Sequence, residues 1–153
     1  DLARRFCNDV LVPNFFPDGI AALQKEKEEG ATVLLITASP SFYLEPMKEI
    51  LGITDVIGTR MDVDPSGLYT GLVGDNCRGL QKPLRLAEYL ASKGERLDYD
   101  TSAAYGNSSG DIPMLQVCSR KVAVNPGKKM RKLLAQTENV TVVSWGVKSA
   151  PKP

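Results

Sequence analysis

The sequence contains no histidine, only three cysteines and a single tryptophan in 153 residues. Without histidine, a cysteine–histidine nucleophile pair cannot form within the chain, so thiol catalysis of that kind is excluded. The cysteines, Cys7, Cys77 and Cys118, are odd in number and lack Cys-x-x-Cys spacing. This argues against a disulfide scaffold or a zinc site, and we expect a cytoplasmic protein in a reducing compartment.

Long apolar runs and charge of one sign are also missing. No stretch reaches the ~20 apolar residues that span a bilayer, and no signal peptide is recognisable. The 19 basic and 18 acidic residues are interspersed and leave a formal net charge of +1, unlike a nucleic-acid-binding protein. We interpret the basic run Lys128 to Lys132 as a solvated helix face. The sequence predicts neither a nucleic-acid partner nor stable membrane insertion, and it leaves the oligomeric state open.

The pattern of apolar residues predicts an α/β fold built on a parallel sheet. The length and the 42% hydrophobic content fit one compact domain. Predicted helices and strands alternate, which is typical of a parallel sheet. The expected helices are 2–12, 17–29, a helix around 44–51, 83–93, 112–117 and 128–136, and the expected strands are 32–37, 55–59, 68–73, 101–105, 121–124 and 140–143. A turn over 62–67 is expected to join strands 55–59 and 68–73 as a hairpin.

Polar residues follow two of these strands. Thr37 ends the nearly continuous apolar run from Thr32, and Asn107 lies in the loop after strand 101–105. Ligands in open parallel sheets bind beyond the carboxyl ends of the strands, so both residues are expected at a binding edge. Ala38 and Ser39 follow Thr37 and turn into the next predicted helix. Hydroxyl and amide groups in such a corner can hold an anion.

Four segments follow one another at regular intervals and carry a family resemblance. They are Leu34–Pro40, Gly74–Lys82, Tyr105–Leu115 and Ala123–Pro126. In this order they resemble the second motif, the segment of the third-motif lysine, the acidic fourth motif and its usual sequel in haloacid dehalogenase (HAD) superfamily hydrolases. The similarity is to the branch that includes phosphoserine phosphatase and phosphatidylglycerophosphatase C. It implies a HAD-like Rossmannoid core, a doubly wound parallel sheet with a β-hairpin insertion.

The resemblance also implies a function and a set of site residues. Such enzymes are Mg²⁺-dependent phosphomonoester phosphatases that act through an aspartyl-phosphate intermediate, and the substrate here would be a small-molecule or lipid phosphomonoester. A transferring phosphoryl group spreads negative charge over its oxygens, so fixed donors and cations stabilise it. The implied catalytic residues are Thr37, Lys82 and Asp111, the phosphate-binding residues Thr37, Ala38, Ser39 and Lys82, and the metal ligands Asn107 and Asp111.

The nucleophilic aspartate of the first motif is not visible in this chain. The only Asp-x-Asp is Asp62-Val63-Asp64, which follows the second motif and precedes Pro-Ser-Gly, so its composition favours a turn. We expect the first strand, with the nucleophile and the general acid/base, and most of the cap to lie upstream of Asp1. Residues 1–16 would be a remnant of a helical cap and linker, 17–148 the core domain and 149–153 a tail. The fragment alone is then expected to be inactive.

Several roles have alternatives at this stage. Asn107 stands where the resemblance places a metal-binding aspartate, and a neutral amide should bind Mg²⁺ more weakly. Asp111 could orient Lys82 or a metal-bound water, or cap the following helix. Thr37 could bond to its own backbone, and Lys82 could be a surface residue at a helix start. The whole chain could instead be a catalytically impaired phosphate-binding or regulatory domain of the same fold, or an unrelated doubly wound ligand-binding domain.

Overall fold

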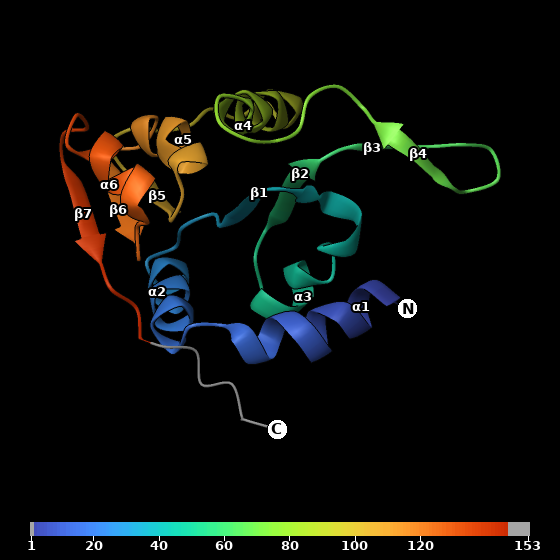
Figure 1. Cartoon of the computed structure of the whole chain (residues 1–153), viewed down its shortest axis with the longest axis horizontal. Coiled ribbons are helices and arrows are strands. Elements are labelled where there is room, and N and C mark those ends of the chain that lie inside the picture. Colours follow the sequence, from blue (N-terminus) through green and yellow to red (C-terminus); the bar gives the residue numbers. More distant parts are fainter. Residues whose placement is uncertain (1, 147–153) are drawn as a thin grey trace. The chain divides into compact units, whose positions relative to one another are not determined.

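The structure is a computed structural model that describes residues 2–146 (Figure 1). The chain forms two compact units, a first unit of residues 2–76 with 145–146 and a second unit of residues 77–144. The predicted tail, 149–153, lies outside the described residues, and the predicted division into a cap remnant, 1–16, and a core domain, 17–148, stays a prediction.

The first unit begins with a helical segment that changes its winding along the chain. The α-helical turns of α1 (Leu2–Phe6) pass into π-helical η1 (Cys7–Leu11) and then into the 3₁₀ turn η2 (Val12–Asn14), so the predicted helix over 2–12 is formed but not regular. Helix α2 (Pro17–Glu28) starts with a proline in its first turn, which suits that position. Gly30 follows at φ 82°, a left-handed conformation that glycine adopts without strain.

A parallel strand pair carries the second predicted motif. β1 (Leu34–Pro40) pairs with β2 (Asp55–Thr59) in register from Leu34 opposite Asp55, with a shift between Ile36 and Pro40. β1 is half-buried along its length and continues through Ala38 and Ser39, beyond the predicted end at Thr37. The next predicted helix starts late, because a 3₁₀ turn, η3 (Ser41–Tyr43), precedes α3 (Met47–Leu51). Pro46 disfavours helical conformation in the residue before it.

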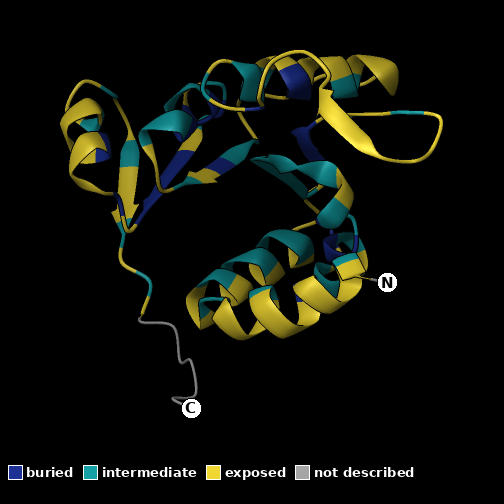
Figure 2. Cartoon of the chain, turned by 45° about the vertical axis from the view of Figure 1, so that its right-hand side comes forward, coloured by how far each residue is buried: buried dark blue, intermediate teal, exposed yellow. Residues whose placement is uncertain are grey.

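The hairpin differs from the prediction in its first strand. β2 pairs in parallel with β1, and a separate strand, β3 (Met61–Val63), forms the antiparallel partner of β4 (Tyr69–Leu72). Asp62 therefore lies in a strand, whereas Asp64 lies in the predicted turn. The Asp64 carboxylate accepts hydrogen bonds from the backbone N–H groups of Ser66 and Leu68 at 2.8 and 3.0 Å, which gives it a structural role. The hairpin is largely exposed (Figure 2).

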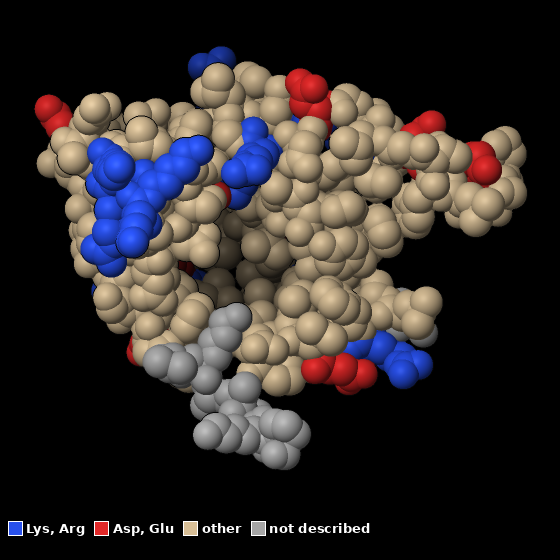
Figure 3. Space-filling model, viewed as in Figure 1, with Lys and Arg blue, Asp and Glu red and all other residues tan. Residues whose placement is uncertain are grey.

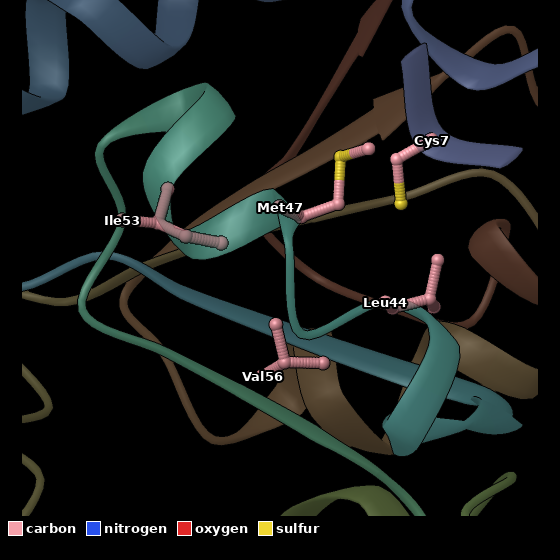
Figure 4. Packing of buried hydrophobic residues seen from close by; sticks show 5 residues of the cluster. All are labelled: Cys7, Leu44, Met47, Ile53 and Val56. Carbon is pink, nitrogen blue, oxygen red and sulfur yellow. The ribbon is translucent and has the colours of Figure 1, made fainter. Parts of the chain in front are cut away.

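A small hydrophobic core joins the elements of the first unit. Side chains from η1, from α3 and the turns before and after it, and from β2 point toward one another (Figure 4). They are Cys7, Leu44, Met47, Ile53 and Val56. Cys7 and Met47 are 0% and 2% exposed, so the N-terminal helical segment is part of this core.

The second unit is a three-stranded parallel sheet with its helices. Strands β5 (Ala103–Gly106), β6 (Arg120–Val124) and β7 (Val140–Val143) pair in chain order, as the alternating pattern predicts. Helices α4 (Gln81–Ser92), α5 (Ile112–Gln116) and α6 (Lys128–Leu134) and the 3₁₀ turn η4 (Ser109–Asp111) complete the unit. Leu86, Leu115, Ala123 and Met130 are buried in it. Over residues 2–146, no helix has the length and apolar character to cross a membrane.

Candidate active site

An ion pair between Lys82 and Asp111 lies at the centre of the candidate site in the second unit. Lys82 sits in the first turn of α4, and Asp111 is the last residue of η4. The Lys82 Nζ donates a hydrogen bond to Asp111 Oδ1 at 2.5 Å, and each side chain is only 12% exposed. Lys82 is therefore not a solvated residue at a helix start. Its ammonium is fixed by a carboxylate that is largely shielded from water.

The other carboxylate oxygen of Asp111 is held by its own loop. Oδ2 accepts hydrogen bonds from the backbone N–H groups of Asn107 at 3.1 Å and Ser108 at 2.9 Å, and from the Ser108 Oγ at 2.8 Å. With Lys82, these donors match the roughly four acceptor positions of a carboxylate. Ser108 and Asp111 form a capping box around η4. The Asp111 side chain thus caps η4, the turn that ends at Asp111, and makes no capping hydrogen bond to α5.

The pKa of Asp111 reflects this environment. Burial alone would raise the pKa, but the hydrogen bond from Lys82, the hydrogen bonds from Ser108 and the charge of Lys82 outweigh it and hold the pKa of Asp111 below its ordinary value. The carboxyl is therefore ionised at neutral pH. Its negative charge keeps the Lys82 ammonium in one place.

Two glycines make room for this arrangement. A Cβ at Gly106 would lie 2.5 Å from the Cβ of Asp111, closer than real contacts allow, so the end of β5 must be glycine for Asp111 to lie over it. Gly110 lies against Arg78, and its carbonyl accepts a hydrogen bond from the Gly79 N–H at 3.1 Å. This contact ties the segment before α4 to η4. Sequence reasoning missed Gly106, although a glycine between a strand end and a polar loop is a recognisable signal.

Asn107 has a different environment from Asp111. Asn107 is exposed, and its backbone N–H donates a hydrogen bond to the Asp111 carboxylate. Mg²⁺ requires about six oxygen ligands in octahedral geometry. Nowhere within residues 2–146 do three or more histidine, cysteine or acidic side chains gather as a metal site. Of the two predicted ligands, the Asp111 carboxylate already accepts hydrogen bonds from Lys82 and from its own loop. Asn107 and Asp111 by themselves therefore do not supply the roughly six oxygen ligands of Mg²⁺.

The predicted phosphate-binding residues Thr37, Ala38 and Ser39 lie in β1 of the first unit. The Thr37 Oγ1 accepts a hydrogen bond from the Ser39 N–H at 3.1 Å, so the alternative of bonding to its own backbone is realised. Its hydroxyl proton can still be donated elsewhere.

Two residues of β2 that the sequence analysis did not single out, Gly58 and Thr59, contact the backbone of β1 at Ala38 and Ser39. The buried Thr59 Oγ1 donates to the Ala38 carbonyl at 2.7 Å. A Cβ at Gly58 would lie 2.7 Å from the Ser39 oxygen, so glycine is required there as well. The Gly-Thr pair at the end of the predicted strand was the available signal.

The structure thus brings together Lys82, Asn107 and Asp111 in one unit and Thr37, Ala38 and Ser39 in the other. The roles of all six in catalysis, phosphate binding and metal binding stay predictions. The geometry establishes that the Lys82 ammonium is fixed by Asp111 in the second unit. In the first unit, a hydrogen bond from Thr59 fixes the end of β1 at Ala38.

We expect strong energetic coupling between Lys82 and Asp111. In a double-mutant cycle of Lys82→Ala, Asp111→Asn and the double variant, urea unfolding at pH 7 should give a coupling free energy of about 3 kcal/mol, since either single change leaves a partner without its counterion. The Asp111 pKa is lowered, so its contribution is complete above the unfolded value of about 3.9. It should be lost as the pH falls through the folded value.

The exposed pair Lys25–Glu29 is the matched control for this cycle. Its charged atoms are 3.8 Å apart, with side chains 71% and 56% exposed. It should show a coupling of about 0.5 kcal/mol or less at every pH. Equal coupling in the two pairs would show that burial does not strengthen the Lys82–Asp111 interaction.

We expect Gly106→Ala to displace Asp111 from its hydrogen bonds. The added methyl group meets the Asp111 Cβ at 2.5 Å. The free energy of unfolding should fall by about 2 kcal/mol, a typical effect of overpacking. Gly71→Ala is the control, because a Cβ at Gly71 meets nothing within 4 Å. Equal stability of the two variants in urea unfolding would contradict the proposed close approach.

Known proteins resemble this chain over most of its length. Residues 1–116 match the haloacid dehalogenase-like hydrolase family. A histidinol-phosphatase of Neisseria meningitidis serogroup C is 32% identical over 131 residues, which cover 84% of this chain and 59% of the relative. A phosphoserine phosphatase of Mycobacterium tuberculosis is 32% identical over 127 residues, which cover 82% of this chain and 40% of the relative. The chain spans about half the length of the curated relatives it matches.

A solved structure shares the fold. The crystal structure of a protein with unknown function from Bordetella pertussis Tohama I superposes with a TM-score of 0.81 at 26% identity, covering 92% of this chain and 63% of that chain. The family match and the shared fold exclude the reading as an unrelated doubly wound domain and confirm the resemblance inferred from the four sequence segments. The chain belongs to the haloacid dehalogenase-like hydrolase family.

Proposed function

We propose that the protein containing this chain is a Mg²⁺-dependent phosphomonoester phosphatase that acts through an aspartyl-phosphate intermediate. The observation that carries the proposal is the shielded Lys82–Asp111 pair. It fixes the Lys82 ammonium at the edge of the second unit where the predicted fourth motif lies. The relatives named histidinol-phosphatase and phosphoserine phosphatase support the class of substrate. The nucleophilic aspartate and the general acid/base would lie on a strand that precedes Asp1.

Lys82 would act on the charge of the transferring phosphoryl group. Asp111 fixes the direction of its ammonium, so no rearrangement is needed when negative charge develops on the phosphoryl oxygens. The same ammonium would help keep the nucleophilic carboxylate ionised. Asp111 is a positioning residue in this scheme, because its oxygens bond to Lys82 and to its own loop.

The Thr37 hydroxyl would donate a hydrogen bond to a phosphoryl oxygen. Its Oγ1 already accepts the Ser39 N–H, which orients the oxygen and leaves its proton for another acceptor. Ala38 and Ser39 would complete the phosphate-binding corner, with Thr59 holding the Ala38 carbonyl away from the anion.

Mg²⁺ would be held by the amide oxygen of Asn107 and by carboxylates from the upstream strand, with Asp111 orienting a bound water. When bound, such an ion offsets negative charge between nucleophile and phosphate. Because Asn107 is neutral, the second candidate function is a catalytically impaired phosphate-binding or regulatory domain. The substrate would be a small-molecule or lipid phosphomonoester. The free, buried cysteines of the described chain favour a cytosolic location.

We expect Lys82→Ala to reduce phosphatase activity by about 10²- to 10³-fold, the usual effect of removing one fixed charge donor. The measurement is Mg²⁺-dependent release of phosphate from p-nitrophenyl phosphate by the protein extended upstream of Asp1, beside the present chain. The extended protein should be active, and the present chain inactive.

Two further variants separate catalysis from folding. Lys93→Ala removes an exposed lysine just after the same helix and should keep full activity. Lys82→Met/Asp111→Asn leaves no unpaired buried charge, so it should fold normally and still be inactive. A folded, extended protein that releases no phosphate would favour the binding domain, and full activity of Lys82→Ala would remove Lys82 from the reaction.

We expect Asn107→Asp to tighten Mg²⁺ binding about tenfold or more in the extended protein, since a charged oxygen replaces a neutral one. Isothermal titration calorimetry with MgCl₂ measures this without reference to activity. Ser109→Asp, a new charge two positions along the same loop, is the control and should bind Mg²⁺ no more than slightly tighter. Unchanged affinity in Asn107→Asp would place Asn107 outside the metal site.

A further inference from the structure

The near-neutral net charge of the chain conceals an uneven distribution. Residues 77–144, the second unit, contain 11 lysines and arginines against 6 acidic residues, whereas residues 2–76 contain 6 against 11. Between Asp111 and Glu138 the chain has basic residues and no acidic ones. Four of these basic residues fall in α6: Lys128, Lys129, Arg131 and Lys132. We call them the α6 patch.

The side chains of the α6 patch lie on the surface of the second unit. All four residues are exposed, while Met130 between them is 1% exposed and anchors the helix. Helix positions three and four apart share a face, so Lys128 lies beside Lys132. Figure 3 shows blue side chains gathered over α6. The Arg131 Nε donates to the Pro126 carbonyl at 2.9 Å, which fixes the start of the helix.

An apolar side chain adjoins this basic surface. Leu133 is 39% exposed and lies four positions after Lys129, on the same side of the helix. Lysines with long flexible stems around an exposed leucine suit a surface whose negative charge is spread out and whose interior is apolar.

We propose that the α6 patch docks the second unit onto a bilayer containing anionic phospholipid. Basic clusters bind such surfaces with about 1 kcal/mol for each lysine or arginine near the headgroups. The patch itself carries no aromatic side chain for stacking on bases and no amide side chain for reading base edges, so a lipid surface fits it better than a nucleic acid. The docking is peripheral and needs no membrane-spanning segment.

The position of α6 gives the docking a consequence for the candidate site. α6 begins four residues after the end of β6 and packs against η4, the turn that ends in Asp111. A bilayer bound at the α6 patch would therefore lie beside the edge of the unit that holds Lys82 and Asp111. The docking itself does not rest on the proposed phosphatase activity, and it can be tested with the present chain alone.

The test is sedimentation of the chain with phosphatidylglycerol/phosphatidylcholine vesicles and with pure phosphatidylcholine vesicles. We expect binding to the anionic vesicles only, weakened by added NaCl. The variant Lys128→Gln/Lys129→Gln/Lys132→Gln should bind about 100-fold more weakly, as the loss of about 1 kcal/mol per lysine predicts. Its thermal unfolding should match that of the parent chain, because these side chains are exposed.

The matched control is Arg5→Gln/Lys25→Gln/Lys93→Gln, which removes the same charge from three exposed positions outside α6. It should bind anionic vesicles within about threefold of the parent chain, since screening limits distant surface charges. Equal losses in the two triple variants, or no binding of the parent chain to anionic vesicles, would overturn the proposal. Tighter binding to duplex DNA than to the vesicles, lost in the α6 variant, would assign the patch to nucleic acid instead.

Discussion

Two opposite charges, the Lys82 ammonium and the Asp111 carboxylate, lie 2.5 Å apart where both side chains are largely shielded from water. Such a pair is favourable only if the remaining polar positions are also satisfied, because removing charges from water is costly. The Ser108 hydroxyl and two backbone N–H groups meet that condition for Asp111. The start of α4 and the loop after β5 are therefore held by one network, and neither can shift without breaking it.

The two candidate corners are built on the same local principle, although they belong to different units. Each has a glycine at a strand end where another segment approaches too closely for a side chain, Gly106 beneath Asp111 and Gly58 beneath Ser39. Each also has a polar side chain that bonds to the backbone of the corner, Asp111 to Asn107 and Thr59 to Ala38. Backbone at a strand end is thereby fixed without being buried in a core.

The sequence predicted elements well where local pattern and packing agree. Strands β2 and β7 have the predicted bounds, since short apolar, β-branched runs bordered by turn residues leave little choice. Strand β3 was missed because Met61–Val63 is short and contains Asp62, so only its pairing with β4 makes it a strand. The contact between Lys82 and Asp111 spans 29 residues, and a family resemblance, not residue propensity, suggested it. The hydrogen bond from Thr59 to the Ala38 carbonyl depends on a register shift between β1 and β2, and no local sequence pattern encodes that shift.

The separation of charge between the units affects how the molecule meets any charged material. A formal net charge of +1 and an isoelectric point near 7.9 predict weak binding to any ion exchanger at neutral pH. A resin, however, interacts with one face at a time, within a Debye length of about 10 Å in ordinary buffers. The residues of the second unit favour a cation exchanger and those of the first an anion exchanger. Chromatographic retention would then report which unit faces the matrix, not the sum of its charges.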